Sequence, residues 1–188
     1  MELSLNFLAI VVLLATNALF VAAEFALVKV SRIRVETLAG EGGAAAKMTL
    51  RILNNLEAYL AACQLGITMA SLGLGWVGEP AVSAILHPIF SWAGVPEAVL
   101  HPVSFATGFL LFSSLHIVIG EQVPKTIAIR KPEMISLWTA YALRIAYVAV
   151  WPLNWLLNQS AKGILALMGI KEASHTEVYS NEELKGMV

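Results

Sequence analysis

Long runs of apolar residues constrain this chain more than any other feature of its sequence. Leu3–Ala23 contains no charged side chain, and similar runs cover Ala58–Gly78, Val103–Ile119 and, with Arg144 as its one charge, Met134–Ala161. A helix of about 20 apolar residues crosses the roughly 30 Å of hydrocarbon in a bilayer. Because backbone polar groups in lipid must be hydrogen-bonded within the protein, such runs form helices. The sequence therefore predicts an all-α membrane protein.

The overall composition supports this class and excludes others. Of the 188 residues, 58% are hydrophobic and 13% are charged, whereas charged residues make up about a quarter of a soluble domain. The formal net charge is -1 and no basic stripe is present, so nucleic-acid binding is not expected. The sequence has no Gly-rich phosphate loop, no zinc-binding His or Cys pair and no nucleophile elbow, so it does not predict an enzyme. The single cysteine, Cys63, can form no intrachain disulfide.

Charges that flank the apolar runs predict the orientation. Lys29, Arg32 and Arg34 follow the first run, which places the N-terminus outside and the next loop in the cytoplasm by the positive-inside rule. Lysines near the C-terminus favour the cytoplasm as well, and this requires an odd number of crossings. We therefore expect a multi-pass protein of the cell (inner) membrane, with three transmembrane helices plus one segment that is re-entrant or interfacial.

The irregular segment is expected within residues Gly73–Pro102. The preceding stretch Ser71–Gly78 contains three glycines, and each weakens a helix by about 1 kcal/mol relative to alanine, so the helix is expected to loosen or break there. Broken membrane helices occur where they line a cavity or are covered by protein. Glu79–Pro102 contains four prolines and no Lys or Arg, which favours the outer side or a re-entrant pair of short helices.

Two shorter segments suit the membrane surface. Ala44–Leu56 follows a glycine-rich turn and is expected to form an amphipathic helix carrying Lys47 and Arg51. Lys162–Ile170 is expected to form a juxtamembrane helix. Arg144 is costly if it faces lipid, so it should meet a carboxylate or extend to the interface.

The stretch His116–Thr126 places polar groups at the end of the third apolar run. It contains Gly120, Glu121, Pro124 and Lys125, none of which a lipid-facing helix needs. Proline has no N–H to donate to the carbonyl four residues earlier, here that of Gly120. We therefore expect a bare Gly120 carbonyl beside the Glu121 carboxylate, which is a candidate cation site.

Further oxygen atoms recur at helical spacing on one face of each of the first two apolar runs. They belong to Asn17, Val21 and Glu24 on the first run and to Gln64, Thr68 and Ser71 on the second. Sites built from oxygen alone suit hard cations such as Mg²⁺, Ca²⁺ or Na⁺ and suit soft metals poorly.

Structural alternatives exist for each of these polar groups. Glu24 could be an interfacial carboxylate paired with Lys29 or Lys125, or it could line an ion cavity. The polar face of the second run could form hydrogen bonds between helices. His116 fits a packed, hydrogen-bonded group better than a ligand.

Three motifs resemble those of one family. Phe20-Val-Ala-Ala-Glu-Phe-Ala-Leu27, Gln64-Leu-Gly-Ile-Thr68 and Gly120-Glu-Gln-Val-Pro-Lys125, in this order, resemble the transmembrane domain of the CorC/CorB/cyclin M (CNNM) magnesium transporters. The resemblance implies a homodimer in the lipid bilayer that exports Mg²⁺, coupled to Na⁺ entry. It also implies three spanning helices, a re-entrant element and a juxtamembrane helix.

The same resemblance implies how the chain is divided. Residues 1–170 would form the transmembrane ion-transport domain. Residues 171–188 would begin a linker to a cytosolic pair of cystathionine-β-synthase-type domains.

From these residues we hypothesise a Mg²⁺ site near the membrane midplane. Its ligands would be Glu24, Ser71, Glu121, the Gly120 carbonyl and the Val21 carbonyl, with Glu121 balancing the charge. At Val21 the family often has Ser, so a side-chain ligand is lost there. Two other functions use the same residues: a membrane-embedded Mg²⁺ sensor or anchor that regulates other transporters, or polar faces that serve as dimer contacts.

Overall fold

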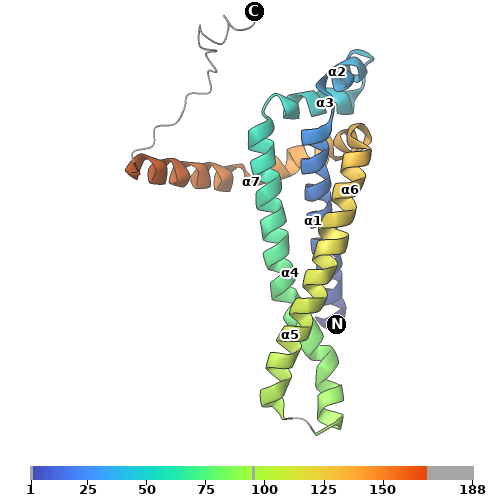
Figure 1. Ribbon diagram of the computed structural model, residues 1–188, viewed down its shortest axis with the longest axis vertical. Helices are drawn as coiled ribbons and strands as arrows, with labels where there is room; N and C mark the ends of the chain where they lie inside the picture. Colours follow the sequence, from blue (N-terminus) through green and yellow to red (C-terminus); the bar gives the residue numbers. More distant parts are fainter. Residues whose placement is uncertain (1, 95, 169–188) are drawn as a thin grey trace, which may run out of the picture. The chain divides into compact units, whose positions relative to one another are not determined.

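The computed structural model describes residues 2–94 and 96–168, which form helices joined by short turns (Figure 1). No strand occurs within these ranges, which confirms the all-α class. The elements are α1 (Glu2–Lys29), α2 (Arg32–Gly40), α3 (Ala44–Leu53), α4 (Leu56–Trp92), α5 (Glu97–Leu115), the π-helix η1 (His116–Gln122), α6 (Val123–Arg130) and α7 (Pro132–Leu167).

The chain divides into two compact units, Met1–Trp151 and Pro152–Val188. In the second unit the structure describes the end of α7, where the side chains whose burial is described are exposed. The expected linker at 171–188 lies outside the described residues.

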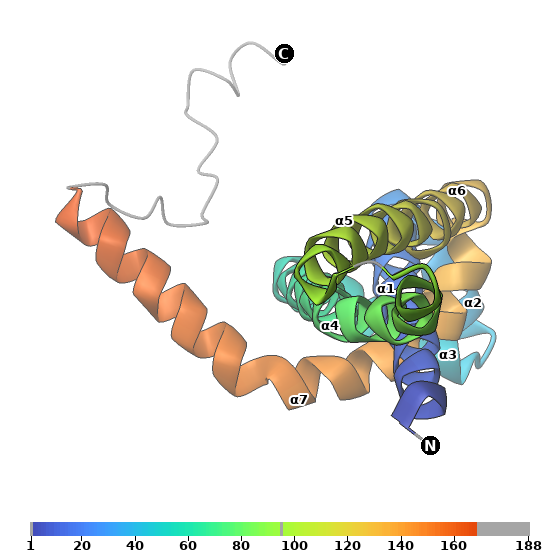
Figure 2. The ribbon, with the colours of Figure 1, turned by 90° about the horizontal axis from the view of Figure 1, so that it is seen from below.

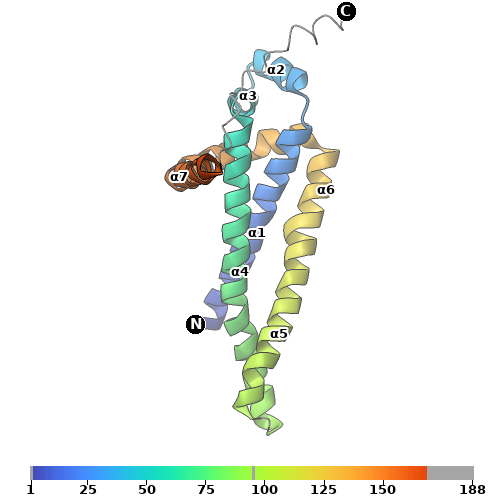
Figure 3. The ribbon, with the colours of Figure 1, turned by 60° about the vertical axis from the view of Figure 1, so that its left-hand side comes forward.

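Four stretches are long and apolar enough to cross a membrane: Ser4–Lys29, Leu56–Trp92, Ala98–Arg130 and Pro132–Leu153. The first three correspond to α1, α4 and the continuous α5–η1–α6 rod, which lie side by side (Figures 1 and 3). Seen from the α4–α5 turn, α1 lies against α4 and α6 (Figure 2). The chain is thus a multi-pass helical membrane protein, while the division into three spans and a re-entrant element stays a prediction.

The part of α7 up to Trp151 runs across one end of α1 and α4 rather than along them (Figures 1 and 3). Ala140 and Leu143 of α7 pack against Leu27 at the end of α1 and Tyr59 at the start of α4. This crossing helix closes the end of the bundle at which most lysines and arginines of the first unit lie.

The expected helix break at Ser71–Gly78 is wrong, because α4 continues through these glycines and through two prolines. Several glycines of α4 serve close helix packing instead. A Cβ atom on Gly66 would overlap the ring of Phe20 on α1, and one on Gly78 would overlap the ring of Phe112 on α5. Small residues let membrane helices approach closely, and the resulting contacts offset the weak helix propensity of glycine.

The expected amphipathic helix at Ala44–Leu56 is confirmed as α3, which buries Ala46, Thr49 and Ile52 on one face. The expected start of a separate juxtamembrane helix at Lys162 is wrong, since α7 is continuous from Pro132 to Leu167.

The partner of Arg144 is a phenol rather than a carboxylate. Its Nη1 atom donates a hydrogen bond to the hydroxyl oxygen of Tyr59, at 3.0 Å. The Tyr59 ring in turn stacks on Tyr147, with 4.3 Å between the ring centroids. The side chain of Arg144 therefore links α7 to α4 by a hydrogen bond to the hydroxyl oxygen of Tyr59, whose ring is part of an aromatic stack.

Candidate metal site

The π-helix η1 is the local feature that positions the Gly-Glu-x-x-Pro-Lys motif. Within it the hydrogen bonds run from each N–H to the carbonyl five residues back, as from Val123 to Val118. π-Helical turns inside longer helices are rare and are found frequently at functional sites. Here the turn comes directly before Pro124, which is buried in the first turn of α6 and could not have donated a backbone hydrogen bond.

Gly120 is the point at which η1 touches α1. Its carbonyl accepts a hydrogen bond of 2.8 Å from Nδ2 of Asn17, in a buried environment. A Cβ atom at Gly120 would lie 2.9 Å from that nitrogen, so only glycine leaves room for this contact. The expectation of a bare Gly120 carbonyl is therefore wrong: the partner that Pro124 cannot supply comes from another helix. A carbonyl oxygen has two lone pairs, so the second can still accept.

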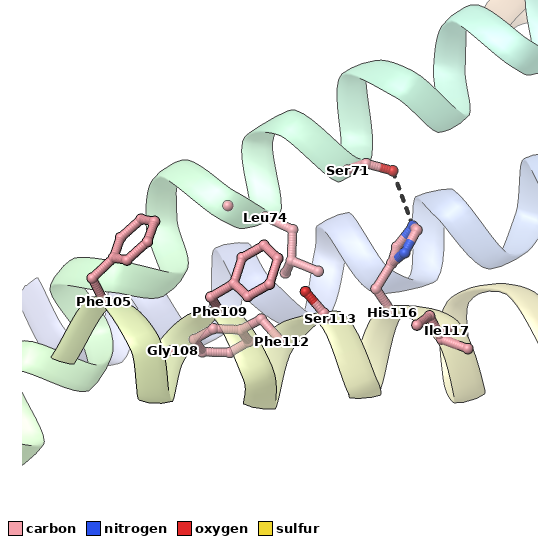
Figure 4. Close-up of a pocket in the computed structure, with 10 residues that line it drawn as sticks. Ser71, Leu74, Phe105, Gly108, Phe109, Phe112, Ser113, His116 and Ile117 are labelled. Atoms are coloured by element: carbon pink, nitrogen blue, oxygen red, sulfur yellow. Dashed lines mark hydrogen bonds between the residues drawn. The ribbon is translucent and has the colours of Figure 1, made fainter. Parts of the chain in front are cut away.

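Ser71 is hydrogen-bonded to His116, which confirms the expectation of a hydrogen-bonded histidine. The Ser71 Oγ atom lies 2.9 Å from Nε2 of His116 and donates to the carbonyl of Ile67 at 2.8 Å (Figure 4). Since a hydroxyl has one hydrogen, its donation to Ile67 requires that Nε2 carry a proton and donate to Ser71. This bond links α4 to η1.

A cavity of about 440 Å³ lies beside this bond, between α4 and α5 (Figure 4). Its walls are aromatic and aliphatic side chains, and Ser71, Ser113 and His116 provide its polar groups. The full lining is Ser71, Leu74, Gly75, Phe105, Gly108, Phe109, Phe112, Ser113, His116 and Ile117.

The two carboxylates of the predicted site lie on α1 and η1, and both are partly exposed. The side-chain amide of Gln64, on α4, lies near the Glu24 carboxylate. Glu24 makes no ion pair with Lys29 or Lys125 among the described residues; the ion pairs Arg32–Glu36 and Arg34–Glu133 lie elsewhere. Lys125 instead places its Nζ atom over the ring of Phe25, 4.5 Å from the centroid.

No group of three or more His, Cys, Asp or Glu side chains that could hold a metal occurs among the residues that the structure describes. A cation site here would need carbonyl, amide and hydroxyl oxygens beside its carboxylates. The predicted ligands divide accordingly: Val21 and Gly120 are buried and could offer backbone oxygens, while Glu24, Ser71 and Glu121 are partly buried and could offer side-chain oxygens.

Sequence reasoning did not foresee that Asn17 binds the Gly120 carbonyl or that Ser71 binds His116. The available signal was the isolation of these polar residues. Asn17 is a buried amide in a run of apolar residues, and a buried polar group requires a hydrogen-bonding partner.

Comparison with known proteins agrees with this architecture. Residues 8–188 match the family described as "Cyclin M transmembrane N-terminal domain". The chain belongs to this family. This cyclin M domain is 46% identical to the "UPF0053 protein YhdT" of Bacillus subtilis over 175 residues, which cover 93% of this chain and 38% of that relative.

Two further relatives are similar over nearly the whole chain. The "UPF0053 protein YugS" of Bacillus subtilis is 44% identical over 97% of the chain and 43% of its own length. The "UPF0053 protein sll0260" of Synechocystis is 35% identical over 100% of the chain and 41% of its own length. The cyclin M domain therefore spans about two fifths of the length of these relatives.

Proposed function

We propose that this cyclin M domain transports Mg²⁺ across the cell (inner) membrane, as efflux coupled to Na⁺ entry. One observation carries the proposal. In an apolar helical bundle, the π-helix η1 brings the Gly120 carbonyl against Asn17 of α1, and the carboxylate residue Glu121 is next in the chain. Ionisable groups within membrane spans are costly and mark ion pathways, and oxygen ligands of this kind suit Mg²⁺ or Na⁺. The direction of transport and the coupling ion rest on the family resemblance.

The proposed ligands are the carbonyls of Val21 and Gly120 and the side chains of Glu24, Ser71 and Glu121. Mg²⁺ requires near-octahedral oxygens at about 2.0 to 2.1 Å. The Ser71 oxygen already takes part in two hydrogen bonds, so it would ligate the ion with its remaining lone pair. Loading of the site therefore leaves the link between α4 and η1 intact.

The test is Mg²⁺ flux in vesicles that contain the purified full chain and a Mg²⁺-sensitive dye. Glu121→Gln keeps the size of the side chain and removes its charge, so flux should fall to the rate of protein-free vesicles. Glu36→Gln is the matched control, because that exposed carboxylate pairs with Arg32 outside the spans. Normal flux in the Glu121 variant would refute the ligand assignment. A Mg²⁺ flux that does not change when a Na⁺ gradient is imposed would refute the coupling to Na⁺ entry.

A second candidate is a membrane-embedded Mg²⁺ sensor or anchor. It is favoured by the length of the relatives, of which this domain matches about two fifths. A sensor and a transporter share the same ion site but differ in turnover. Vesicles whose protein binds Mg²⁺ but moves none would favour the sensor.

We also propose that two copies of the chain associate. Gln64, Thr68 and Ser114 are exposed side chains on membrane helices, and polar side chains in lipid favour contact between helices. Cross-linking in native membranes checks this: recovery of only the uncross-linked single chain would argue against a dimer.

A further inference from the structure

The orientation of the Asn17 side-chain amide is fixed by its hydrogen bond to Gly120. Its Nδ2 atom lies 2.8 Å from the Gly120 carbonyl oxygen. A carbonyl oxygen can only accept, so the amide nitrogen of Asn17, and not its oxygen, must face Gly120. The Oδ1 atom therefore points away from Gly120.

That oxygen is buried and lacks a donor. Asn17 is 1% exposed, and Oδ1 accepts no hydrogen bond from the part of the chain that the structure describes. Leaving a buried acceptor unpaired costs about 1 to 3 kcal/mol. A neutral amide oxygen is also a ligand of the type that hard cations take from proteins.

The nitrogen of Asn17 replaces a backbone group that the sequence has removed. In an α-helix the carbonyl of Gly120 would accept from residue 124, but Pro124 has no N–H. The Asn17 amide supplies the donor from α1, and the absence of a side chain at Gly120 lets it approach.

We propose that Asn17 bridges the Gly120 carbonyl and the transported cation. Its Nδ2 atom holds the Gly120–Glu121 segment in place, and its Oδ1 atom offers the cation one further oxygen. The proposal rests on the proposed function, since it adds a residue to that site. It adds Asn17 to Val21 and Glu24 as the residues that α1 contributes to the ion site.

Four variants separate the two roles of Asn17. Asn17→Ala removes both the donor and the oxygen, and adding Pro124→Ala restores the N–H that α-helical pairing would direct at the Gly120 carbonyl. Asn17→Asp with Pro124→Ala keeps a side-chain oxygen while the backbone supplies the donor. Ser104→Ala is the control, because Ser104 of α5 is the other buried side chain with an unpartnered oxygen in the described ranges.

Two readouts are taken on the purified full chain: hydrogen exchange of residues 116–125, and the Mg²⁺ concentration that gives half of the maximal thermal stabilisation. Asn17→Ala alone should speed exchange, and both double variants should restore it. Asn17→Ala with Pro124→Ala should still need about 10- to 100-fold more Mg²⁺. Asn17→Asp with Pro124→Ala should respond near the original concentration, as should Ser104→Ala.

Contrary outcomes are distinct. If Asn17→Ala with Pro124→Ala responds to Mg²⁺ like the original chain, Asn17 is a hydrogen-bond donor only and its role as a ligand is refuted. If Asn17→Ala leaves hydrogen exchange unchanged, its positioning role is refuted. If the original chain shows no Mg²⁺ response, the proposed function fails together with the ligand role, while hydrogen exchange still decides the positioning role.

Discussion

At Gly66 the missing side chain is a packing requirement. The ring of Phe20 occupies the space that a Cβ atom would need, whereas Gly75, on the same helix, has no atom within 4 Å of such a position. Alanine substitution should therefore have opposite effects at the two sites. Gly66→Ala should lower the free energy of unfolding by about 1 to 3 kcal/mol through overpacking. Gly75→Ala should raise it by up to about 1 kcal/mol through helix propensity.

Denaturant unfolding of the two variants in detergent checks this prediction. If Gly66→Ala is instead the more stable of the two variants, the ring of Phe20 moves aside without cost. The ring of Phe20 belongs to the core cluster shared by α1, α4 and α7, so we expect it to resist displacement.

Predictions about single residues were correct where they depend on the covalent structure of the chain nearby. They were wrong where they depend on a partner residue that is distant in the sequence. Pro124 must leave a carbonyl without its usual donor, and that follows from covalent structure. The donor that replaces it belongs to Asn17, 103 residues away in the sequence. Arg144 needed a polar partner for the same kind of reason, but its identity as Tyr59 depends on how α7 crosses α4.

At the scale of elements, apolar runs and the amphipathic pattern of α3 were sufficient to predict helices. Local propensity misjudged α4, because Gly66, Gly73 and Gly78 lie in contacts with α1 or α5 that sequence spacing does not reveal. The π-helix could not be predicted, since no local pattern among residues 116–122 distinguishes hydrogen bonds to the fifth residue from those to the fourth. Each of these outcomes was decided by helix packing.

The attachment of α7 to α4 gives a prediction at the same scale. Tyr59→Phe keeps the ring stacked on Tyr147 but removes the oxygen that accepts from Arg144. The free energy of unfolding should fall by about 1 kcal/mol, the usual net value of one hydrogen bond. Tyr141→Phe is the control, because that exposed tyrosine of α7 lies outside this contact. Equal thermal unfolding temperatures for the two variants would show that α7 is held by apolar packing alone.

For the whole molecule, the distribution of charge predicts which end faces the cytoplasm. Lys29, Arg32 and Arg34 follow α1, Arg130 and Lys131 follow the α5–η1–α6 rod, and no Lys or Arg occurs from Ile52 to Pro124. The positive-inside rule then places the α4–α5 turn outside. Three crossings would return the chain to the cytoplasm before α7, and a fourth crossing by Pro132–Leu153 would take it outside again.

Single cysteines introduced into a Cys63→Ala background resolve these alternatives. Ala93→Cys at the α4–α5 turn and Lys47→Cys in α3 replace exposed residues at opposite ends of the bundle. A membrane-impermeant maleimide should label the first in intact cells and the second only after permeabilisation. Gln159→Cys, at an exposed position late in α7, should behave like Lys47→Cys if α1, α4 and the α5–η1–α6 rod are the three crossings. Labelling of Gln159→Cys in intact cells would instead show that α7 crosses the membrane, and labelling of Lys47→Cys there would invert the orientation.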